Sequence, residues 1–291
     1  MSGSWIRCSD MKRMAVRYGI DFSRPQVMTI VNVTPDSFYE GSRTTDEADV
    51  VARVREAVAA GCSIVDVGGY SSRPNADDVS PNEEWRRVET GIRCVRAVSA
   101  DIPVSIDTFR ASVAERAVSA DSRIIINDIS AGALDPAIID VAVESGVPYI
   151  AMHMRGTPAT MQSMTDYDDI TAEVKRYFGE KIESFLSRGM RDENIILDAG
   201  FGFAKTLDQN YELLGRLNEI CGMGYPVLAG LSRKSMIYKL LGVTPSESLA
   251  GTVALGWEAL RQGATILRVH DTRAAVDTVK IFETYGRNLK R

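Results

Sequence analysis

Short apolar runs alternate along the chain with longer stretches whose apolar residues recur every three or four positions. The short runs are rich in Val, Ile and Leu, as is typical of strands that are buried on both faces of a parallel sheet. We expect eight such strands, at residues 27–33, 64–67, 104–107, 124–128, 149–153, 195–198, 227–230 and 266–269.

The longer stretches predict helices between these strands. Pro81 suits the first turn of one helix, and glycines such as Gly61 and Gly263 follow the last turn of others. The expected helices cover residues 46–60, 82–99, 110–119, 136–144, 170–188, 207–221, 236–241, 246–262 and 272–285. A strand–helix unit repeated eight times favours a closed (β/α)8 barrel, of the TIM-barrel type, over an open doubly wound sheet.

The pattern indicates one α/β domain at residues 26–291, with residues 1–25 as an N-terminal extension over the barrel bottom. Two connections, 34–45 after the first strand and 68–80 after the second, are long and rich in Gly, Ser, Pro, Asn and Asp. Long loops after barrel strands are often functional, so we expect both to be mobile lids, although plain surface loops would show the same composition.

Composition narrows the possible partners. The 291 residues carry a formal net charge of −5, which gives no general reason to expect nucleic acid or an anionic membrane as a partner. The four cysteines form no C-x-x-C pair, and the two histidines, His153 and His270, are too few for a typical zinc site. The chain shows neither a signal-peptide core nor a run of about 18 apolar residues, so we expect a cytoplasmic protein.

Polar residues gather where the predicted strands end. In a barrel, the carboxyl ends of all strands meet at one mouth, where active sites lie. A single aspartate there can be structural, but burying many charged groups is costly unless they are paired or used. The set therefore predicts a functional site made of Asn32, Asp66, Asp107, Asn127, Asp128, Asp198, Arg268 and His270.

The loop after the seventh strand suggests an anion site. It reads Gly-Leu-Ser-Arg-Lys-Ser at residues 230–235 and precedes a short helix, and the eighth strand brings Arg268 and His270 to the same side. Loops after the last two strands often bind phosphate in this fold. Lys234 could instead be an exposed lysine or a Schiff-base lysine, and its place in a loop disfavours the latter.

A second loop, Gly-Phe-Gly-Phe-Ala-Lys at residues 200–205, follows Asp198. It is compatible with a simple tight turn. Beside a strand-end carboxylate it also suggests an aromatic wall for a flat, heteroaromatic ligand that is rich in N–H donors. We interpret His153 as a residue of the rim or just behind it, and not as a metal ligand.

In this order, these segments resemble the dihydropteroate synthase family over residues 27–285. The matching segments are 32–38, 66–69, 71–74, 105–108, 126–129, 152–158, 198–205, 232–235 and 268–271. Three positions depart from the family pattern, since Tyr70, Asn75 and Ala199 stand where Glu, Gly and Pro are usual. These departures concern the behaviour of the loops more than the reaction.

The resemblance implies a transferase of the folate pathway. Such an enzyme joins 4-aminobenzoate to (7,8-dihydropterin-6-yl)methyl diphosphate and yields dihydropteroate and diphosphate, through a dissociative mechanism in which diphosphate leaves first. The resemblance also implies Mg²⁺ as cofactor, small-molecule substrates as partners and a homodimer.

Carried onto this sequence, the resemblance assigns roles to strand ends and loops. It places the pterin on Asp66, Asp107, Asn127, Asp198, Phe203 and Lys234. It places the diphosphate on Asn32, Arg268 and His270, with Asn32 also on the metal. It places 4-aminobenzoate near Phe38, Ser71, Ser72, Arg73, Pro74 and Ser235. The residues expected to act in catalysis are Asp36, Arg73, Asp107 and Lys234.

Two rival interpretations remain at this point. One is a pterin-binding barrel that transfers a methyl group to a corrinoid protein, which would not need residues 71–74 or the anion site. The other is a paralogue that binds pterin or a protein partner without catalysis. The presence of Asn32, Asp36, Lys234 and His270 argues against the second.

Overall fold

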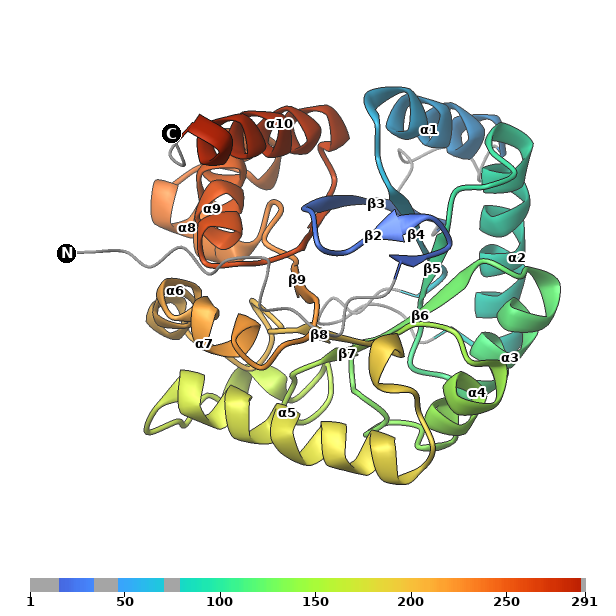
Figure 1. Ribbon diagram of the computed structural model, residues 1–291, viewed down its shortest axis with the longest axis horizontal. Helices are drawn as coiled ribbons and strands as arrows, with labels where there is room; N and C mark the ends of the chain where they lie inside the picture. Colours follow the sequence, from blue (N-terminus) through green and yellow to red (C-terminus); the bar gives the residue numbers. More distant parts are fainter. Residues whose placement is uncertain (1–15, 34–46, 71–78, 289–291) are drawn as a thin grey trace.

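Eight parallel strands close into a barrel in the computed structural model, which describes residues 16–33, 47–70 and 79–288. Figure 1 looks along the barrel and shows the helices around it. The barrel strands are β3 (Gln26–Asn32), β4 (Ile64–Gly68), β5 (Val104–Asp107), β6 (Ile124–Asp128), β7 (Tyr149–Met152), β8 (Ile195–Asp198), β9 (Val227–Ala229) and β10 (Ile266–Val269). Each strand pairs with its neighbour in sequence, and β10 returns to β3.

The outer layer consists of helices that connect the strands. They are α1 (Glu47–Ala60), α2 (Pro81–Val98), α3 (Ala111–Ala120), α4 (Ala137–Ser145), α5 (Ile170–Ser187), α6 (Leu207–Gly215), α7 (Leu217–Cys221), α8 (Ser235–Leu241), α9 (Leu249–Arg261) and α10 (Thr272–Asn288). Local signals start several of them. Ser80 caps α2 just before Pro81, and Thr206 and Gln209 form a capping box on α6.

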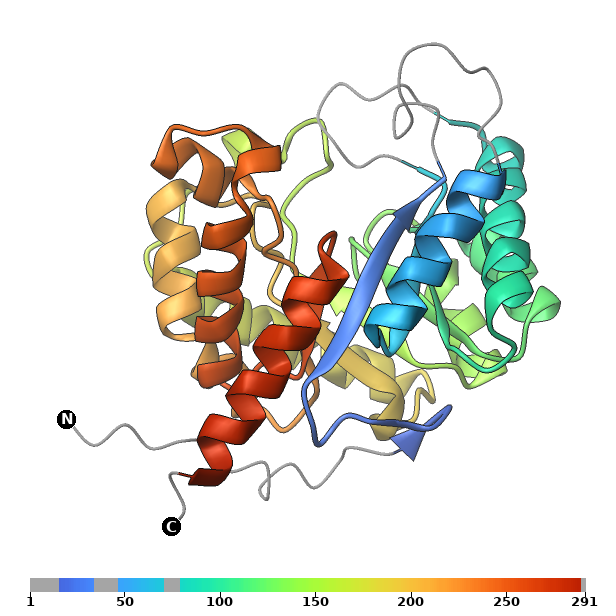
Figure 2. The same ribbon diagram turned by 90° about the horizontal axis from the view of Figure 1, so that it is seen from above.

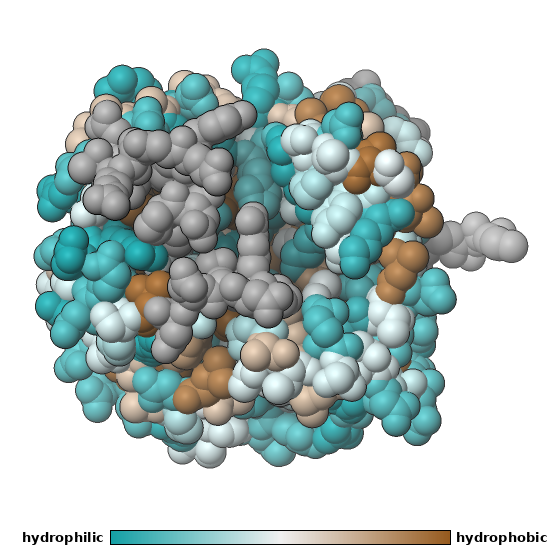
Figure 3. Space-filling view, turned by 180° about the vertical axis from the view of Figure 1, so that it is seen from behind, coloured by the Kyte–Doolittle hydropathy of each residue, from teal (hydrophilic) through white to brown (hydrophobic). Residues whose placement is uncertain are grey.

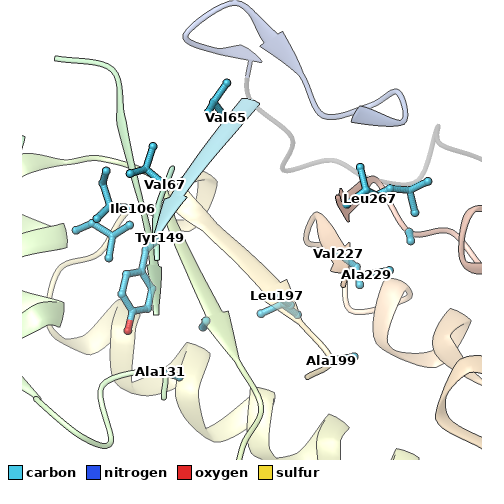
Figure 4. Close-up of a cluster of buried hydrophobic side chains, with 14 of the residues drawn as sticks. Val65, Val67, Ile106, Ala131, Tyr149, Leu197, Ala199, Val227, Ala229 and Leu267 are labelled. Atoms are coloured by element: carbon cyan, nitrogen blue, oxygen red, sulfur yellow. The ribbon is translucent and has the colours of Figure 1, made fainter. Parts of the chain in front are cut away.

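Strand alternation separates two cores. Residues on the outer surface of the sheet pack against the helices, as Figure 4 shows for Val65, Val67, Tyr149 and Leu197. Residues that point inward form a second cluster across the lower half of the barrel, namely Met28, Ile64, Ile125, Ile150, Ile196, Leu228 and Ile266. Two residues further along, four of these inward positions are polar, namely Asp66, Asn127, Asp198 and Arg268, and they form the core of the site.

The lower end of the barrel is closed by the segment that precedes β3. Two short antiparallel strands, β1 (Val16–Arg17) and β2 (Ile20–Asp21), lie at this end, as Figure 2 shows for β2. Ile20 and Phe22 are buried in the lower cluster of the barrel. The opposite end is therefore the one that is open to ligands.

The sequence-based expectations match this fold closely, with two differences in the helices. The stretch 207–221 forms two helices, because the backbone leaves the helical region at Arg216, which Asp169, Glu212 and Glu219 hold by ion pairs. The stretch 246–262 begins with a 3-10 turn, Pro245–Glu247, before α9 starts at Leu249. The prediction of a single (β/α)8 barrel is confirmed, while the loops at 34–46 and 71–78 lie outside the described residues.

Candidate active site

The open end of the barrel carries the candidate site. In Figure 2 the strand β3 points toward this end. Figure 3 looks onto it from behind and shows a hollow in the middle of the face, with hydrophilic residues on its walls. The side chains that reach it come from the last inward position of each strand, because successive residues of a strand alternate between the two faces of the sheet.

Arg268 is the centre of a buried charge network in the upper barrel. Its Nε donates to Asp66 Oδ2 at 2.7 Å, and its Nη2 donates to Asp107 Oδ2 at 2.5 Å. Asn127 Nδ2 donates to the other oxygen of Asp66 at 3.2 Å. Four residues from β4, β5, β6 and β10 are thus held in one layer, with Asp66 fully buried.

The pKa values of this network follow from burial and pairing. Burial raises the pKa of Asp107 to about 7, and the Arg268 guanidinium limits the rise because it favours the carboxylate. For Arg268, burial opposes the charge, but Asp66 and Asp107 outweigh it and hold the pKa above its ordinary value. The network therefore keeps one permanent cation beside the carboxyl groups of Asp66 and Asp107.

Asp198 and Lys234 form the second part of the site. Asp198 is 6% exposed, and its Oδ1 accepts a hydrogen bond from the Gly200 backbone at 2.8 Å. Among the described residues, its Oδ2 has no hydrogen-bond partner. Burial raises the pKa of Asp198, although Lys234 pulls it back, and burial lowers the pKa of Lys234 to about 8.

An apolar cluster stands next to these charges. The Lys234 ammonium hydrogen-bonds the Phe201 carbonyl and lies 4.7 Å from the centre of the Phe203 ring. Phe203 packs against a cluster that includes Ile129, Met152 and Met154 at the ends of β6 and β7. The sequence analysis missed Met152. Its inward direction follows from the two-residue step after Ile150, but only the structure shows that Ile150 points inward.

His270 and Ser232 occupy the side formed by β9 and β10. Ser232 Oγ lies 3.0 Å from His270 Nδ1, and Arg53 of α1 hydrogen-bonds the His270 carbonyl. Arg233 forms a two-point ion pair with Asp271, with distances of 2.9 and 2.6 Å, which joins the two loops. Burial, together with the nearby Arg268, lowers the pKa of His270 to about 4, so its ring is neutral at physiological pH.

Asn32 and Ser235 lie at the edges of the site. Asn32 ends β3 and pairs with Gly68 on β4. Because Gly68 has no side chain, the space between Asn32 and Asp107 stays open. A Cβ added at Gly68 would lie 3.2 Å from Asn32 Oδ1. Ser235 begins α8 directly after Lys234 and is partly exposed. Both residues therefore face the same end of the barrel as the charge network.

Asp128 does not belong to the mouth, which corrects the sequence-based expectation. It follows the inward-facing Asn127, so its side chain lies on the outer face of the sheet. There its carboxylate accepts hydrogen bonds from Tyr149 Oη at 2.7 Å and from the backbone of Ser130 and Gly132 at 2.8 and 2.6 Å. Asp128 is thus a structural residue that shapes the turn after β6.

Two buried basic residues stand behind the loop that follows β8. Lys205 is 4% exposed, and its Nζ lies 3.0 Å from His153 Nδ1. Burial lowers the pKa of His153 to about 2 and that of Lys205 to about 7. His153 therefore lies behind the site wall, and Lys205 was missed because nothing in the sequence distinguishes a buried lysine from an exposed one.

Tyr70, one of the departures from the family pattern, has a packed environment. Its ring makes an edge contact with Phe109 at 5.3 Å and lies 5.2 Å from the guanidinium carbon of Arg110. Arg110 in turn donates to the buried Glu84 at 2.6 Å. These contacts connect Tyr70, which follows β4, to Phe109 and Arg110, which follow β5.

Six predicted site residues lie outside the described residues, so the structure says nothing of their placement. They are Asp36, Phe38, Ser71, Ser72, Arg73 and Pro74. Within the described ranges, no cluster of three or more His, Cys, Asp or Glu side chains could hold a metal ion. None of the helices in those ranges is long and apolar enough to cross a membrane.

Comparisons with known proteins define the class to which this barrel belongs. The sequence profile described as "Pterin binding enzyme" matches residues 28–270. The dihydropteroate synthase of Escherichia coli K12 is 42% identical over 273 residues, which cover 94% of this chain and 96% of that protein.

Solved structures agree with this match. The dihydropteroate synthase of Xanthomonas albilineans with 4-aminobenzoic acid superposes with a TM-score of 0.86 at 38% identity, over 94% of this chain and 98% of that one. The same enzyme in complex with 7,8-dihydropteroate gives a TM-score of 0.82 at 37% identity, over 92% and 95%. The chain belongs to the pterin binding enzyme family, and within it to the dihydropteroate synthases, which are transferases.

Proposed function

We propose that this chain condenses (7,8-dihydropterin-6-yl)methyl diphosphate with 4-aminobenzoate to give dihydropteroate and diphosphate. The observation that carries the proposal is the inward polar layer of Asp66, Asp107, Asn127 and Arg268, with Asp198 and Lys234 beside it, at the open end of a barrel of this family. Complexes of the Xanthomonas relative with 4-aminobenzoic acid and with 7,8-dihydropteroate support the choice of substrates.

The pterin is the ligand that suits the deep part of the site. A pterin ring is flat and presents an N–H-rich, guanidine-like edge, for which the Oδ2 of Asp198 is a suitable acceptor. Asn127 and Asp107 supply further acceptors on the neighbouring strands. Lys234 is placed to donate to the ring carbonyl, and Phe203 with Met152 offers an apolar wall.

The diphosphate fits the side on which Arg268 and His270 lie. Arg268 keeps its positive charge, and His270 is neutral with Ser232 at one ring nitrogen. If the Ser232 hydroxyl donates to Nδ1, the other ring nitrogen carries the proton and can donate to the diphosphate. Asn32 offers a hard amide oxygen at the same end, which suits Mg²⁺ because this ion is often bound through one or two protein oxygens and the phosphates of the substrate. When bound there, Mg²⁺ would neutralise charge on the leaving diphosphate.

The charges of the site suit a dissociative reaction. As diphosphate departs, the pterin methylene becomes cationic, and a carboxylate near it stabilises that charge. A single carboxylate about 4 Å from a unit positive charge is worth about 4 kcal/mol at an effective dielectric of about 20, or roughly a thousandfold in rate. We propose Asp107 for this role, supported by its position at the end of β5, with Asp36 as a second carboxylate.

The arylamine nitrogen then attacks the cation and forms the new C–N bond. No strong base is needed, because the amine of 4-aminobenzoate is already neutral before attack and the acidic ammonium formed afterwards releases its proton to water or to the diphosphate. We propose that Ser235 and the loop residues Phe38, Ser71, Ser72, Arg73 and Pro74 hold 4-aminobenzoate. Arg73 would pair with its carboxylate, and the apolar members would cover its ring.

Product formation by the purified protein tests the proposal. The pterin diphosphate, 4-aminobenzoate and Mg²⁺ are mixed with the protein, and dihydropteroate and diphosphate are quantified by mass spectrometry and a phosphate assay. We expect both products in equal amounts, and no dihydropteroate when either substrate is omitted. Absence of both products with a folded protein would leave pterin binding without this transfer, as in the rival interpretations.

We also propose that the protein is a homodimer. Four large apolar side chains are exposed on two helices that both pack against α9, with Leu240 57% and Leu241 53% exposed on α8, and Ile281 62% and Tyr285 46% exposed on α10. The helix α9 lies between α8 and α10 in Figures 1 and 2. An apolar face of this kind is a common feature of subunit interfaces.

A further inference from the structure

Lys205 satisfies three acceptors at once from a buried position behind the site. Its Nζ donates to the Gly200 carbonyl at 2.9 Å and to the Phe203 carbonyl at 3.0 Å, and it lies 3.0 Å from His153 Nδ1. In its protonated form Lys205 has three N–H donors, so donors and acceptors then match one to one. Because the His153 ring is neutral, its Nδ1 can accept the third bond.

The loop that Lys205 holds has an unusual backbone. Gly200, Gly202 and Ala204 all have positive φ values, of 67°, 81° and 48°. Gly200 also packs so closely on β7 that an added Cβ would lie 2.0 Å from the His153 carbonyl oxygen. A segment with three left-handed residues persists only where its surroundings fix it, and Lys205 ties it from the inside.

A second tie holds the loop from its other side. Asn210 Oδ1 accepts from the Gly202 backbone at 2.6 Å, and its Nδ2 donates to the Thr206 carbonyl at 2.6 Å. Asn210 therefore fixes the outer part of the loop to α6. The carbonyls of Gly200 and Phe203 point the other way, toward Lys205.

This loop sets the position of several groups of the pterin site. Its Gly200 amide holds Oδ1 of Asp198 at 2.8 Å. Its Phe201 carbonyl accepts the hydrogen bond from Lys234, and its Phe203 ring lies 4.7 Å from the same ammonium. A shift of the loop would therefore displace a carboxylate, a cation and an aromatic wall together.

We propose that Lys205 is a positioning residue for the reaction, which acts by holding the loop 199–204 in the conformation that presents Asp198, Lys234 and Phe203 to the pterin. Lys205 does not touch the substrate in this proposal. The inference rests on the proposed function for its effect on turnover, whereas its effects on the loop and on pterin binding do not depend on turnover.

The test compares Lys205→Met with a matched control. Methionine keeps the length and apolar volume of lysine but removes its donors. The Phe203 carbonyl and His153 Nδ1 then lose the bond from Lys205, and the Gly200 carbonyl keeps only the Phe203 amide at 3.1 Å. Lys181→Met is the control, because Lys181 also donates from a partly buried Nζ to a loop carbonyl, that of Ala131 at 2.7 Å, but on the outer side of the barrel. Pterin binding is measured by calorimetry with a pterin that lacks the diphosphate, and the loop by amide hydrogen exchange.

We expect Lys205→Met to raise the dissociation constant of the pterin by about tenfold or more, which corresponds to about 1.4 kcal/mol. Exchange at the Gly200–Phe203 amides should accelerate, and kcat should fall, while KM for 4-aminobenzoate at saturating pterin diphosphate changes little. Lys181→Met should leave the pterin affinity and the exchange of this loop as in the unmodified protein.

Two results would overturn the proposal. One is a folded Lys205→Met protein with unchanged pterin affinity and unchanged exchange of the loop. The other is an equal loss of pterin affinity in Lys205→Met and Lys181→Met, which would reflect general destabilisation. If Lys205→Met does not fold, Lys205→Gln is the substitute, because glutamine retains two donors. We expect Lys205→Gln to speed up exchange in the loop and to weaken pterin binding, both by less than Lys205→Met would. No change in either quantity would again contradict the proposal.

The proposed function can fail separately. If the unmodified protein forms no dihydropteroate but binds the pterin, the proposed reaction is wrong. The comparison of pterin affinity and loop exchange among these variants would still decide the role of Lys205.

Discussion

At the scale of single residues, Arg268 pairs with two buried carboxyl groups, in addition to the role in anion binding that we propose for it. The sequence analysis assigned it to the diphosphate, but the structure shows that it also pairs with Asp66 and Asp107, on β4 and β5. Sequence reasoning could place all three residues at the mouth because each lies in the second half of a predicted strand. It could not predict which charges pair, because pairing depends on the stagger of strands around the barrel.

This pairing leads to a prediction for Arg268→Ala. Removing one partner of a buried ion pair leaves the other charge uncompensated, and we expect the free energy of unfolding to fall by about 3–5 kcal/mol. Urea unfolding measures this value. Adding Asp66→Asn to Arg268→Ala should restore part of the lost free energy of unfolding, since it removes one of the buried charges that Arg268→Ala leaves without a partner. A loss below about 1 kcal/mol would show that the network contributes little to stability.

The buried His153 predicts a dependence of stability on pH. Its pKa is about 2 in the folded protein, against an ordinary value of 6.5, so the unfolded chain binds the proton more readily. The contribution of His153 to the free energy of unfolding therefore has its full value above pH 6.5 and decreases as the pH falls below that value.

We expect His153→Gln to make the free energy of unfolding less sensitive to pH between 7.5 and 5.5, with a difference of about 1 kcal/mol across this range. Urea titrations of both proteins at several pH values measure it. Parallel pH profiles for the variant and the unmodified protein would mean that His153 is not kept neutral by folding.

At the scale of elements, strand alternation decides which polar residues belong to the site. Asn127 and Asp128 are adjacent at the end of β6, and the sequence placed both at the mouth. Only the first points inward, while the second binds Tyr149 on the outer face. A continuous apolar strand gives no sequence signal for its inward face, because both faces are buried, so this distinction needed the structure.

The same geometry predicts that Tyr149→Phe affects stability and not activity. The hydroxyl donates to a buried carboxylate, and a lost hydrogen bond to a charged group costs about 1.5–3 kcal/mol. We expect that loss in urea unfolding, with kcat and KM within about twofold of the unmodified protein, a difference of about 0.4 kcal/mol. A large loss of pterin affinity at unchanged stability would place Asp128 in the site after all.

At the scale of the whole molecule, the sequence predicted the fold better than the site. Eight apolar runs marked the strands to within about one residue, because parallel strands in a barrel must be buried on both faces. The boundaries of helices were less certain, as the break at Arg216 shows. The buried Lys205 and the inward-facing Met152 escaped notice because three-dimensional packing, and not residue type, gives them their place.

The proposed dimer is a further property of the whole molecule. If the exposed face of α8 and α10 is the interface, Ile281→Glu places a charge in its apolar part. We expect light scattering to show a dimer for the unmodified protein and a monomer for the variant. Arg287→Glu on the same helix, near its exposed end, is the control and should change the mass little. A monomeric unmodified protein, or a dimer that survives Ile281→Glu, would contradict this interface.

The central claim is that the inward polar layer at the barrel mouth binds the pterin and supports its transfer to 4-aminobenzoate. The most direct measurement is the rate of dihydropteroate and diphosphate formation by the unmodified protein, Asp198→Asn and Tyr149→Phe under the same conditions. We expect equal amounts of both products from the unmodified protein and from Tyr149→Phe. Asp198→Asn should lose about tenfold to a hundredfold in kcat/KM, since a charge-assisted hydrogen bond in a buried site is worth about 1.5–3 kcal/mol. Turnover by Asp198→Asn at the unmodified rate would contradict the account, because the site would then lie elsewhere.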